Sequence, residues 1–114
     1  MNQPRRKKFF HMLKSVRDFV QEQPDIVRQE LNDIIWKLEI DGTLSMPYGE
    51  KVSGDLFAIR VIQAGNIRVF YAYGTNDIVY GLHGYVKKTQ EIPVHEKRHA
   101  IRILRQLRQG GLIK

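Results

Sequence analysis

The sequence contains no cysteine among its 114 residues. Disulfide frameworks, thiolate metal sites and cysteine nucleophiles are therefore excluded, and a reducing cytosol is the expected environment. It also lacks any run of about 18 apolar residues, the length that a membrane-spanning helix needs. No continuous apolar region of the kind found in a secretory signal follows the basic residues 5–8. We expect a soluble, unprocessed, cytoplasmic protein with no membrane partner.

Several motifs of known chemistry are absent as well. The sequence has no GxxxxGK[ST] phosphate loop and no GxSxG nucleophile motif, and the acidic residues fall mostly in its helical half, where no glycosidase pair is predicted. His95 and His99 are four residues apart, as in two-histidine metal sites. No third ligand is spaced nearby and the surroundings are basic, so we predict neither a metal site nor a cofactor.

The sequence does have an excess of positive charge, which is unevenly distributed. The net charge is +7; residues 1–17 carry six basic and no acidic side chains, 18–50 carry two basic and eight acidic, and 51–114 carry eleven basic and four acidic. A basic C-terminal half favours a polyanionic partner, because binding phosphates releases counterions. It fits an acidic protein partner equally well, and many small basic proteins bind no nucleic acid.

The periodicity predicts an α+β fold in a single domain of residues 1–114. The segment KFFHML predicts a strand, and a helix follows through Val16 and Val20. A strong amphipathic helix is predicted from Pro24 and Asp25 to just before Gly42. After a loop over residues 42–54, three β-rich runs with short connections predict an antiparallel sheet of three or four strands; the runs are LFAIRVI, IRVFYAY and DIVYGLHGYVKK. A basic helix is predicted between Pro93 and Gly110, and the sheet is predicted to pack against this helix and the N-terminal helices.

Alternation along the strands brings a set of functional side chains together. One face of the sheet is predicted to carry Arg60, Arg68, Phe70, His83, Tyr85 and Lys87, with Ile78, Tyr80 and Leu82 on the opposite face. Guanidinium groups bind phosphate and aromatic rings stack on unpaired bases, so this mixture favours single-stranded RNA. The alternative is a solvated sheet face that carries these residues for solubility alone.

Basic groups without a metal can support attack of an RNA 2′-hydroxyl on its neighbouring phosphate. Such a step needs a proton acceptor, cations near the phosphate and an acid for the leaving oxygen. His83 is the natural titrating candidate, although a lone histidine in a strand is more often structural.

Residues 44–107 resemble the RelE/HigB branch of toxins from type II toxin–antitoxin modules, particularly the phage-derived HigB-like family of the RelE/ParE superfamily. The similar elements are LSMPYGEKVSGDLF, IRV with Arg60, IRVFY with Arg68, and LHGYVKKTQEIP followed by a basic helix. Where many relatives have Glu-Leu-Arg, this chain has Ala58-Ile59-Arg60. Some RelE toxins carry a catalytic tyrosine near the end of the chain, and Tyr85 or His83 is a hypothetical substitute here.

The resemblance implies a ribosome-dependent mRNA endonuclease that needs no metal. By position, the resemblance assigns the gripping and cleavage of RNA to Arg60, Arg68, Lys87 and Lys88. Together with the residues predicted from facing and charge, the candidate catalytic residues are Arg60, Arg68, His83 and Lys87. The candidate RNA-binding residues are Phe70, Tyr85, Lys88, Lys97 and Arg98. The implied partners are the ribosome with its mRNA and a cognate antitoxin of the helix-turn-helix, HigA-like kind. The toxin would contact operator DNA only through this antitoxin.

Two other functions stay open from the sequence. ParE-like relatives of similar fold poison DNA gyrase without cutting RNA, so the fold alone does not separate the two activities. A non-catalytic RNA-binding or ribosome-binding module would bind in a salt-sensitive way without cleaving. His83 together with the paired lysines Lys87 and Lys88 favours the nuclease.

Overall fold

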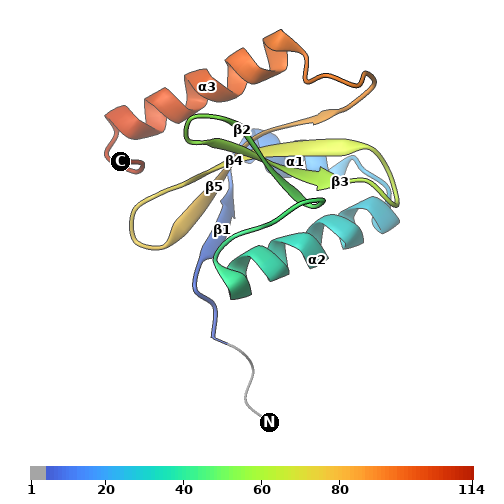
Figure 1. Cartoon of the computed structure of the whole chain (residues 1–114), viewed down its shortest axis with the longest axis horizontal. Coiled ribbons are helices and arrows are strands. Elements are labelled where there is room, and N and C mark those ends of the chain that lie inside the picture. The colour runs from blue at the N-terminus through green and yellow to red at the C-terminus, as the bar shows by residue number, and fades with distance from the viewer. Residues whose placement is uncertain (1–4) are drawn as a thin grey trace.

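The computed structural model describes residues 5–114 and confirms the predicted α+β fold class. Its elements in chain order are β1 (Phe9–Met12), α1 (Lys14–Gln21), α2 (Asp25–Asp41), β2 (Gly49–Ser53), β3 (Leu56–Val61), β4 (Ile67–Tyr73), β5 (Ile78–Val86) and α3 (Val94–Gln109). The sheet runs between α3 on one side and α2 on the other (Figure 1).

The sheet in the described residues has five strands in the order β1-β5-β4-β3-β2, where the sequence predicted three or four. The additional strand β2 lies in the segment that was predicted as a loop, and it pairs antiparallel with β3. β1 pairs parallel with β5, so the sheet is mixed and not wholly antiparallel. A parallel pair requires a long connection, which the intervening helices and strands provide.

α2 forms over the residues that its sequence predicts. It begins directly after Pro24 and ends at Gly42, whose φ of 83° is a left-handed conformation that glycine adopts without strain. The N–H of Gly42 donates to the carbonyl of Leu38 at 2.7 Å, which satisfies one of the last free carbonyls of the helix. The buried side of α2 is apolar and consists mainly of Val27, Leu31, Ile34 and Leu38.

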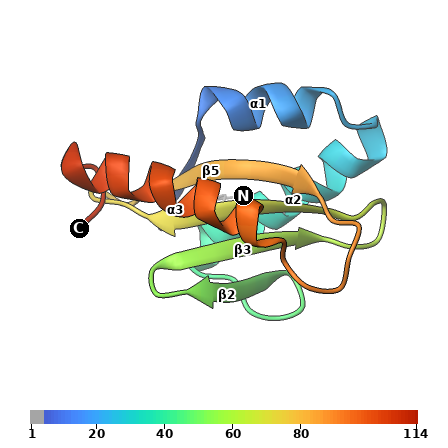
Figure 2. The ribbon, with the colours of Figure 1, turned by 90° about the horizontal axis from the view of Figure 1, so that it is seen from above.

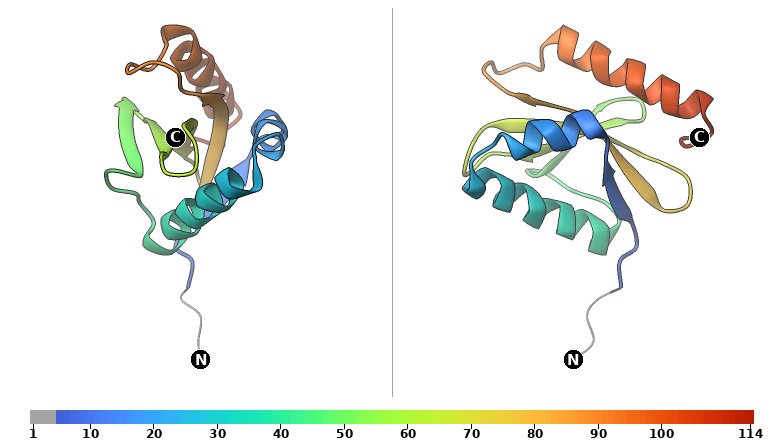
Figure 3. Two further views of the ribbon diagram at one scale, coloured as in Figure 1. Left: turned by 90° about the vertical axis from the view of Figure 1, so that its right-hand side faces the viewer. Right: turned by 180° about the vertical axis from the view of Figure 1, so that it is seen from behind.

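Each face of the sheet has its own apolar core. The core beneath α1 and α2 includes Val16, Leu31, Ile59, Val69 and Tyr71. The core beneath α3 includes Ala58, Phe70, Leu82, Ala100 and Leu104. Figure 2 shows β5 between α1 and α3, and Figure 3 shows α1 over the sheet when the molecule is seen from behind. The C-terminal helix α3 docks on the sheet through its apolar stripe, as predicted, and it covers much of the face that we expected to be open to RNA.

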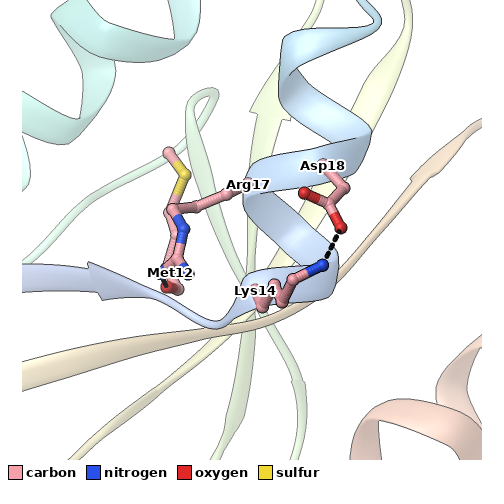
Figure 4. Close-up of polar contacts among 4 residues, drawn as sticks. All are labelled: Met12, Lys14, Arg17 and Asp18. Atoms are coloured by element: carbon pink, nitrogen blue, oxygen red, sulfur yellow. Dashed lines mark hydrogen bonds and ion pairs between the residues drawn. The ribbon is translucent and has the colours of Figure 1, made fainter.

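The free edge of β1 is closed by two side chains. The backbone N–H of Phe10 donates to Glu39 Oε2 at 2.9 Å, and Arg17 Nη1 donates to the carbonyl of Met12 at 2.8 Å. Figure 4 shows the second contact at the start of α1, next to the ion pair of Lys14 with Asp18. These contacts satisfy backbone N–H and carbonyl groups that could otherwise form hydrogen bonds with a strand of another molecule.

Candidate RNA-binding and cleavage site

Two neighbouring rows of side chains cross the α3 face of the sheet. In one row the directly opposed residues are Arg60 on β3, Arg68 on β4 and Tyr85 on β5. In the next row they are Glu50, Ala58, Phe70 and His83, from β2 to β5. The rows are two residues apart on each of these strands, so their side chains point to the same face. We refer to Glu50, Arg60, Arg68, Tyr85 and Lys87 as the Arg68 cluster.

Arg68 is the buried cation of this cluster, with 3% of its surface exposed. Its Nη1 donates to Asn66 Oδ1 and to the carbonyl of Ile67, both at 3.1 Å. Burial lowers the pKa of Arg68, the nearby Arg60 lowers it further, and Glu50 opposes this effect. An arginine remains charged under such conditions, so a fixed positive charge lies just below the protein surface.

Arg60 and Lys87 are partly exposed and form the rim of the cluster. Arg60 Nη1 donates to the carbonyl of Pro47 at 3.0 Å, which ties β3 to the loop before β2. Lys87 exchanges two hydrogen bonds with Asn66: its N–H donates to the Asn66 carbonyl at 2.8 Å, and its carbonyl accepts from Asn66 Nδ2 at 2.7 Å. Burial and then the charge of Arg68 lower the pKa of Lys87, which Glu50 partly offsets.

Glu50 is the member of the cluster that the sequence did not predict. It belongs to β2, whose register places it opposite Ala58, in line with Phe70 and His83. Its charge acts on Arg68, Tyr85 and Lys87. Recognising GEKVS as a strand would have revealed its facing, but Gly49, Gly54 and Pro47 gave the segment the composition of a loop.

Four buried side-chain polar atoms have no hydrogen-bond partner within residues 5–114, and all four belong to the Arg68 cluster. They are Glu50 Oε1, Arg60 Nε, Arg68 Nε and Tyr85 Oη. Buried polar atoms are usually paired, and each unpaired one costs about 1–3 kcal/mol. Three of the four can donate a hydrogen bond and one can only accept. This set is complementary to a ligand that has anionic oxygens beside a hydroxyl group.

The hydroxyl group of Tyr85 stays protonated up to high pH. The pKa of Tyr85 is raised to about 12, mainly by burial; the charge of Arg68 opposes this rise, and the charges of Glu96 and Glu50 add to it. The phenol is therefore a proton donor throughout the physiological range. Its ring is stacked on that of Phe70, with centroids 5.5 Å apart, and this packing fixes the position of the hydroxyl group.

Regular alternation with Tyr85 places His83 on the same face as the cluster, and a β-bulge in β5 comes directly before His83. Phe70 pairs with His83 but Tyr71 pairs with Gly81, so Leu82 is an extra residue in β5. The prediction that Tyr80 and Leu82 lie opposite His83 was therefore wrong, because regular alternation stops at the bulge; both belong to the core under α3, and Ile78 packs against it. The ring of His83 stacks on Tyr85, with centroids 6.3 Å apart.

The remaining predicted contact residues lie elsewhere. Phe70 is completely buried, so its ring is not available to stack on a base, and we no longer count it among the RNA-contacting residues. Lys88 is exposed in the connection between β5 and α3. Lys97 and Arg98 belong to the first half of α3, and Arg98 lines a hollow on the side of that helix away from the buried Ala100. The structure thus brings Arg60, Arg68, Tyr85 and Lys87 together, with His83 beside them.

Residues 5–114 contain no group of three or more histidine, cysteine or acidic side chains arranged to hold a metal ion. In the same part of the chain, no helix is both long and apolar enough to cross a membrane.

The sequence from residue 18 to residue 105 matches the family model of the phage-derived Gp49-like proteins (DUF891). The chain belongs to this family. It is a family associated with toxin–antitoxin modules, and membership implies an antitoxin partner. No curated protein matches the sequence. The matched segment includes α2, the β2–β5 strands and most of α3, and it therefore contains every residue of the Arg68 cluster.

Proposed function

We propose that this protein is a RelE/HigB-type toxin that cleaves ribosome-bound mRNA without a metal ion. The observation that carries the proposal is the Arg68 cluster, in which unpaired donors of Arg60, Arg68 and Tyr85 lie with one unpaired acceptor of Glu50. A phosphodiester accepts hydrogen bonds through its non-bridging oxygens, and the neighbouring 2′-hydroxyl can donate one. RNA offers both groups at every linkage, whereas DNA lacks the hydroxyl group.

The reaction is an internal displacement at phosphorus. The 2′-oxygen forms a bond to phosphorus and loses its proton to a base, the bond from phosphorus to the 5′-oxygen breaks, and an acid protonates that leaving oxygen. The products end in a 2′,3′-cyclic phosphate and a 5′-hydroxyl. Arg60 and Lys87 bind the phosphate at the rim, while Arg68 stabilises its additional negative charge from below. Tyr85 is the proposed acid, since it keeps its proton at neutral pH.

Two residues are candidates for the base. Glu50, within the cluster, has a buried carboxylate oxygen without a hydrogen-bond partner. His83 lies two residues before Tyr85 on β5, and both side chains are on the same face of the sheet. The sequence pointed to His83 or Tyr85 and not to Glu50. Either residue would act by accepting the proton of the 2′-hydroxyl group, a role that typically contributes a factor of about 10²–10⁴ to the rate.

The RNA footprint extends onto the basic residues that surround the cluster. Lys88 lies in the connection between β5 and α3, and Lys97 and Arg98 lie in the first half of that helix. Their contribution is sequence-independent attraction to phosphates, which suits binding to the ribosome and its mRNA. The antitoxin partner is proposed to be of the helix-turn-helix, HigA-like kind, which would provide the only link to operator DNA.

Primer extension on a defined mRNA tests this function. Purified protein is incubated with that mRNA, with and without stalled bacterial ribosomes, in excess EDTA. We expect breaks only with ribosomes, undiminished by EDTA, and upstream fragments that end in a cyclic phosphate. Intact mRNA would contradict the proposal. In that case a DNA gyrase cleavage assay, and salt-dependent RNA binding without products, separate a gyrase poison from a simple binding module.

A further inference from the structure

His83 is held by a carboxylate from another element. Its Nε2 lies 3.0 Å from Oε1 of Glu96, which is in the first turn of α3. Both side chains are about four-fifths buried, with 20% and 19% of their surfaces exposed. Phe70 and Tyr85 stack on the imidazole at ring angles of 10° and 14°. Packing therefore fixes the plane of the ring, and the contact with Glu96 fixes its direction within that plane.

The partner of Nε2 determines which nitrogen carries the proton in the neutral ring. A carboxylate oxygen accepts a hydrogen bond but cannot donate one, so Nε2 must carry the proton. Nδ1 is then the nitrogen with the free electron pair, the only one that can accept a proton from a ligand. Rotating the ring by half a turn would place Cε1 instead of Nε2 against the carboxylate, so this hydrogen bond would be lost.

We propose that Glu96 is the positioning residue for His83: it holds the Nε2 proton and leaves Nδ1 free to accept the proton of the RNA 2′-hydroxyl. This inference rests on the proposed function and goes further, because it assigns the base to His83 and gives α3 a role in the site. The first turn of α3 must be docked on the sheet for the base to point correctly.

The groups around this pair are consistent with the arrangement. The ring of His99 lies edge-on to that of His83, with centroids 4.5 Å apart. Burial lowers the pKa of His99, and His83 and Arg102 lower it further, so this neighbour is favoured in its neutral form. His95 Nε2 is 3.7 Å from the same oxygen of Glu96, but its side chain is 81% exposed. Glu96 is thus the negative charge closest to His83, and His95 is a suitable control.

The first measurement is an NMR spectrum of the full-length protein labelled with ¹⁵N in its histidine rings. We expect the neutral His83 ring to show a proton on Nε2 that exchanges slowly with water. In Glu96→Ala that proton should exchange rapidly, while in His95→Gln it should be unchanged. Glu96→Gln keeps an acceptor oxygen and should retain the slow exchange. A proton on Nδ1 of His83 in the wild-type protein would overturn the proposal, whether or not the variants fold.

The second measurement is single-turnover cleavage of mRNA on stalled ribosomes by the same proteins. Glu96→Ala should lower the maximal rate at least about tenfold, with an unchanged half-saturating concentration, because the base is misdirected but binding is not. His95→Gln should cleave like the wild type, and Glu96→Gln should lie between the two. Equal rates for Glu96→Ala and the wild type would overturn the assignment.

The two measurements distinguish the two possible failures. If the wild-type protein does not cleave at all, the proposed function is wrong, and the NMR spectrum still decides whether Glu96 holds His83. If the wild-type protein cleaves but Glu96→Ala changes neither proton exchange nor the cleavage rate, the proposed function is retained and the positioning role of Glu96 is wrong.

Discussion

Tyr85 contributes its ring and its hydroxyl group in different ways. The ring packs on Phe70 and is part of the core under α3. The hydroxyl oxygen is buried without a hydrogen-bond partner, beside the charges of Arg68, Glu96 and Glu50. Folding gains little from such a group, because water solvates it better in the unfolded chain. A buried hydroxyl group that contributes little to stability is expected where a ligand uses it.

Replacing Tyr85 by phenylalanine separates the two contributions. Tyr85→Phe should raise the free energy of unfolding at pH 7 by about 1–3 kcal/mol, since the ring stays and a buried hydroxyl group without a partner is removed. Its maximal cleavage rate should fall about 10²-fold, because the proposed acid is gone. Chemical denaturation and single-turnover cleavage measure these effects, and a variant that cleaves at the wild-type rate would exclude Tyr85 as the acid.

The same substitution has a signature in alkaline solution. The pKa of Tyr85 is raised to about 12 in the folded protein, above the value of about 10 in an unfolded chain. Its contribution to stability is therefore complete below pH 10 and is lost as the pH rises towards 12. Tyr85→Phe should lose less stability than the wild type over that range.

Glu30 shows how one side chain shapes a connection between two elements. It projects from α2, and its carboxylate accepts hydrogen bonds from the backbone N–H groups of Ile62, Gln63 and Ala64, the last at 2.6 Å. These residues form the turn between β3 and β4, which carry Arg60 and Arg68. Burial tends to raise the pKa of Glu30, but the three backbone hydrogen bonds outweigh it and lower the pKa.

The stability that Glu30 provides should depend on pH. Because the pKa is lowered on folding, the contribution is present above the unfolded value of about 4.3 and is lost as the pH falls through the folded value. At pH 7, Glu30→Gln should lower the free energy of unfolding by about 1 kcal/mol, a modest effect since water screens the site. Denaturation at several pH values tests this, and a constant difference between the two proteins down to pH 3 would contradict it.

The elements with strong local signals were the ones that the sequence predicted. α2 has a sustained apolar stripe, a proline at its start and a glycine at its end, and its bounds are as expected. β2 was missed because it is short and lies between turn-forming residues. The parallel pairing of β1 with β5 depends on contacts between distant segments, which no local pattern encodes.

The alternation of side chains along the strands predicted the facing of some site residues correctly and of others incorrectly. It grouped Arg60, Arg68 and Tyr85 correctly, since these three residues lie opposite one another in regular ladders. It failed for Leu82, because a bulge in β5 cannot be recognised from one sequence. Glu96 was not considered because its contact with His83 depends on how α3 docks, which is a property of the tertiary structure.

At the scale of the whole molecule, positive charge is concentrated along α3. Arg98, Arg102 and Arg105 line a hollow of about 570 Å³ on its outer side, and Arg108 ties the end of the helix to Asp55 at 2.8 Å. These exposed charges attract any polyanion and should be sensitive to salt. Arg68, in contrast, is buried among groups that suit a single phosphodiester. We therefore assign binding strength to the outer side of α3 and chemistry to the Arg68 cluster.

The most direct test of this account compares Arg68→Ala with Arg105→Ala in single-turnover mRNA cleavage on ribosomes, over a range of salt concentrations. Both substitutions remove one arginine, so the net charge is matched. Arg68→Ala should lose at least about 10²-fold in maximal rate at every salt concentration, because transition-state charge is no longer stabilised. Arg105→Ala should change the maximal rate little and recover its binding at low salt.

Arg60→Ala, at the half-exposed rim, serves as the second cluster variant if Arg68→Ala does not fold, and thermal unfolding of each protein checks this. The account predicts a lost maximal rate for the folded cluster variants and a salt-dependent binding loss for Arg105→Ala. Cleavage by folded Arg68→Ala and Arg60→Ala at the wild-type rate would contradict the assignment of the Arg68 cluster as the site of cleavage.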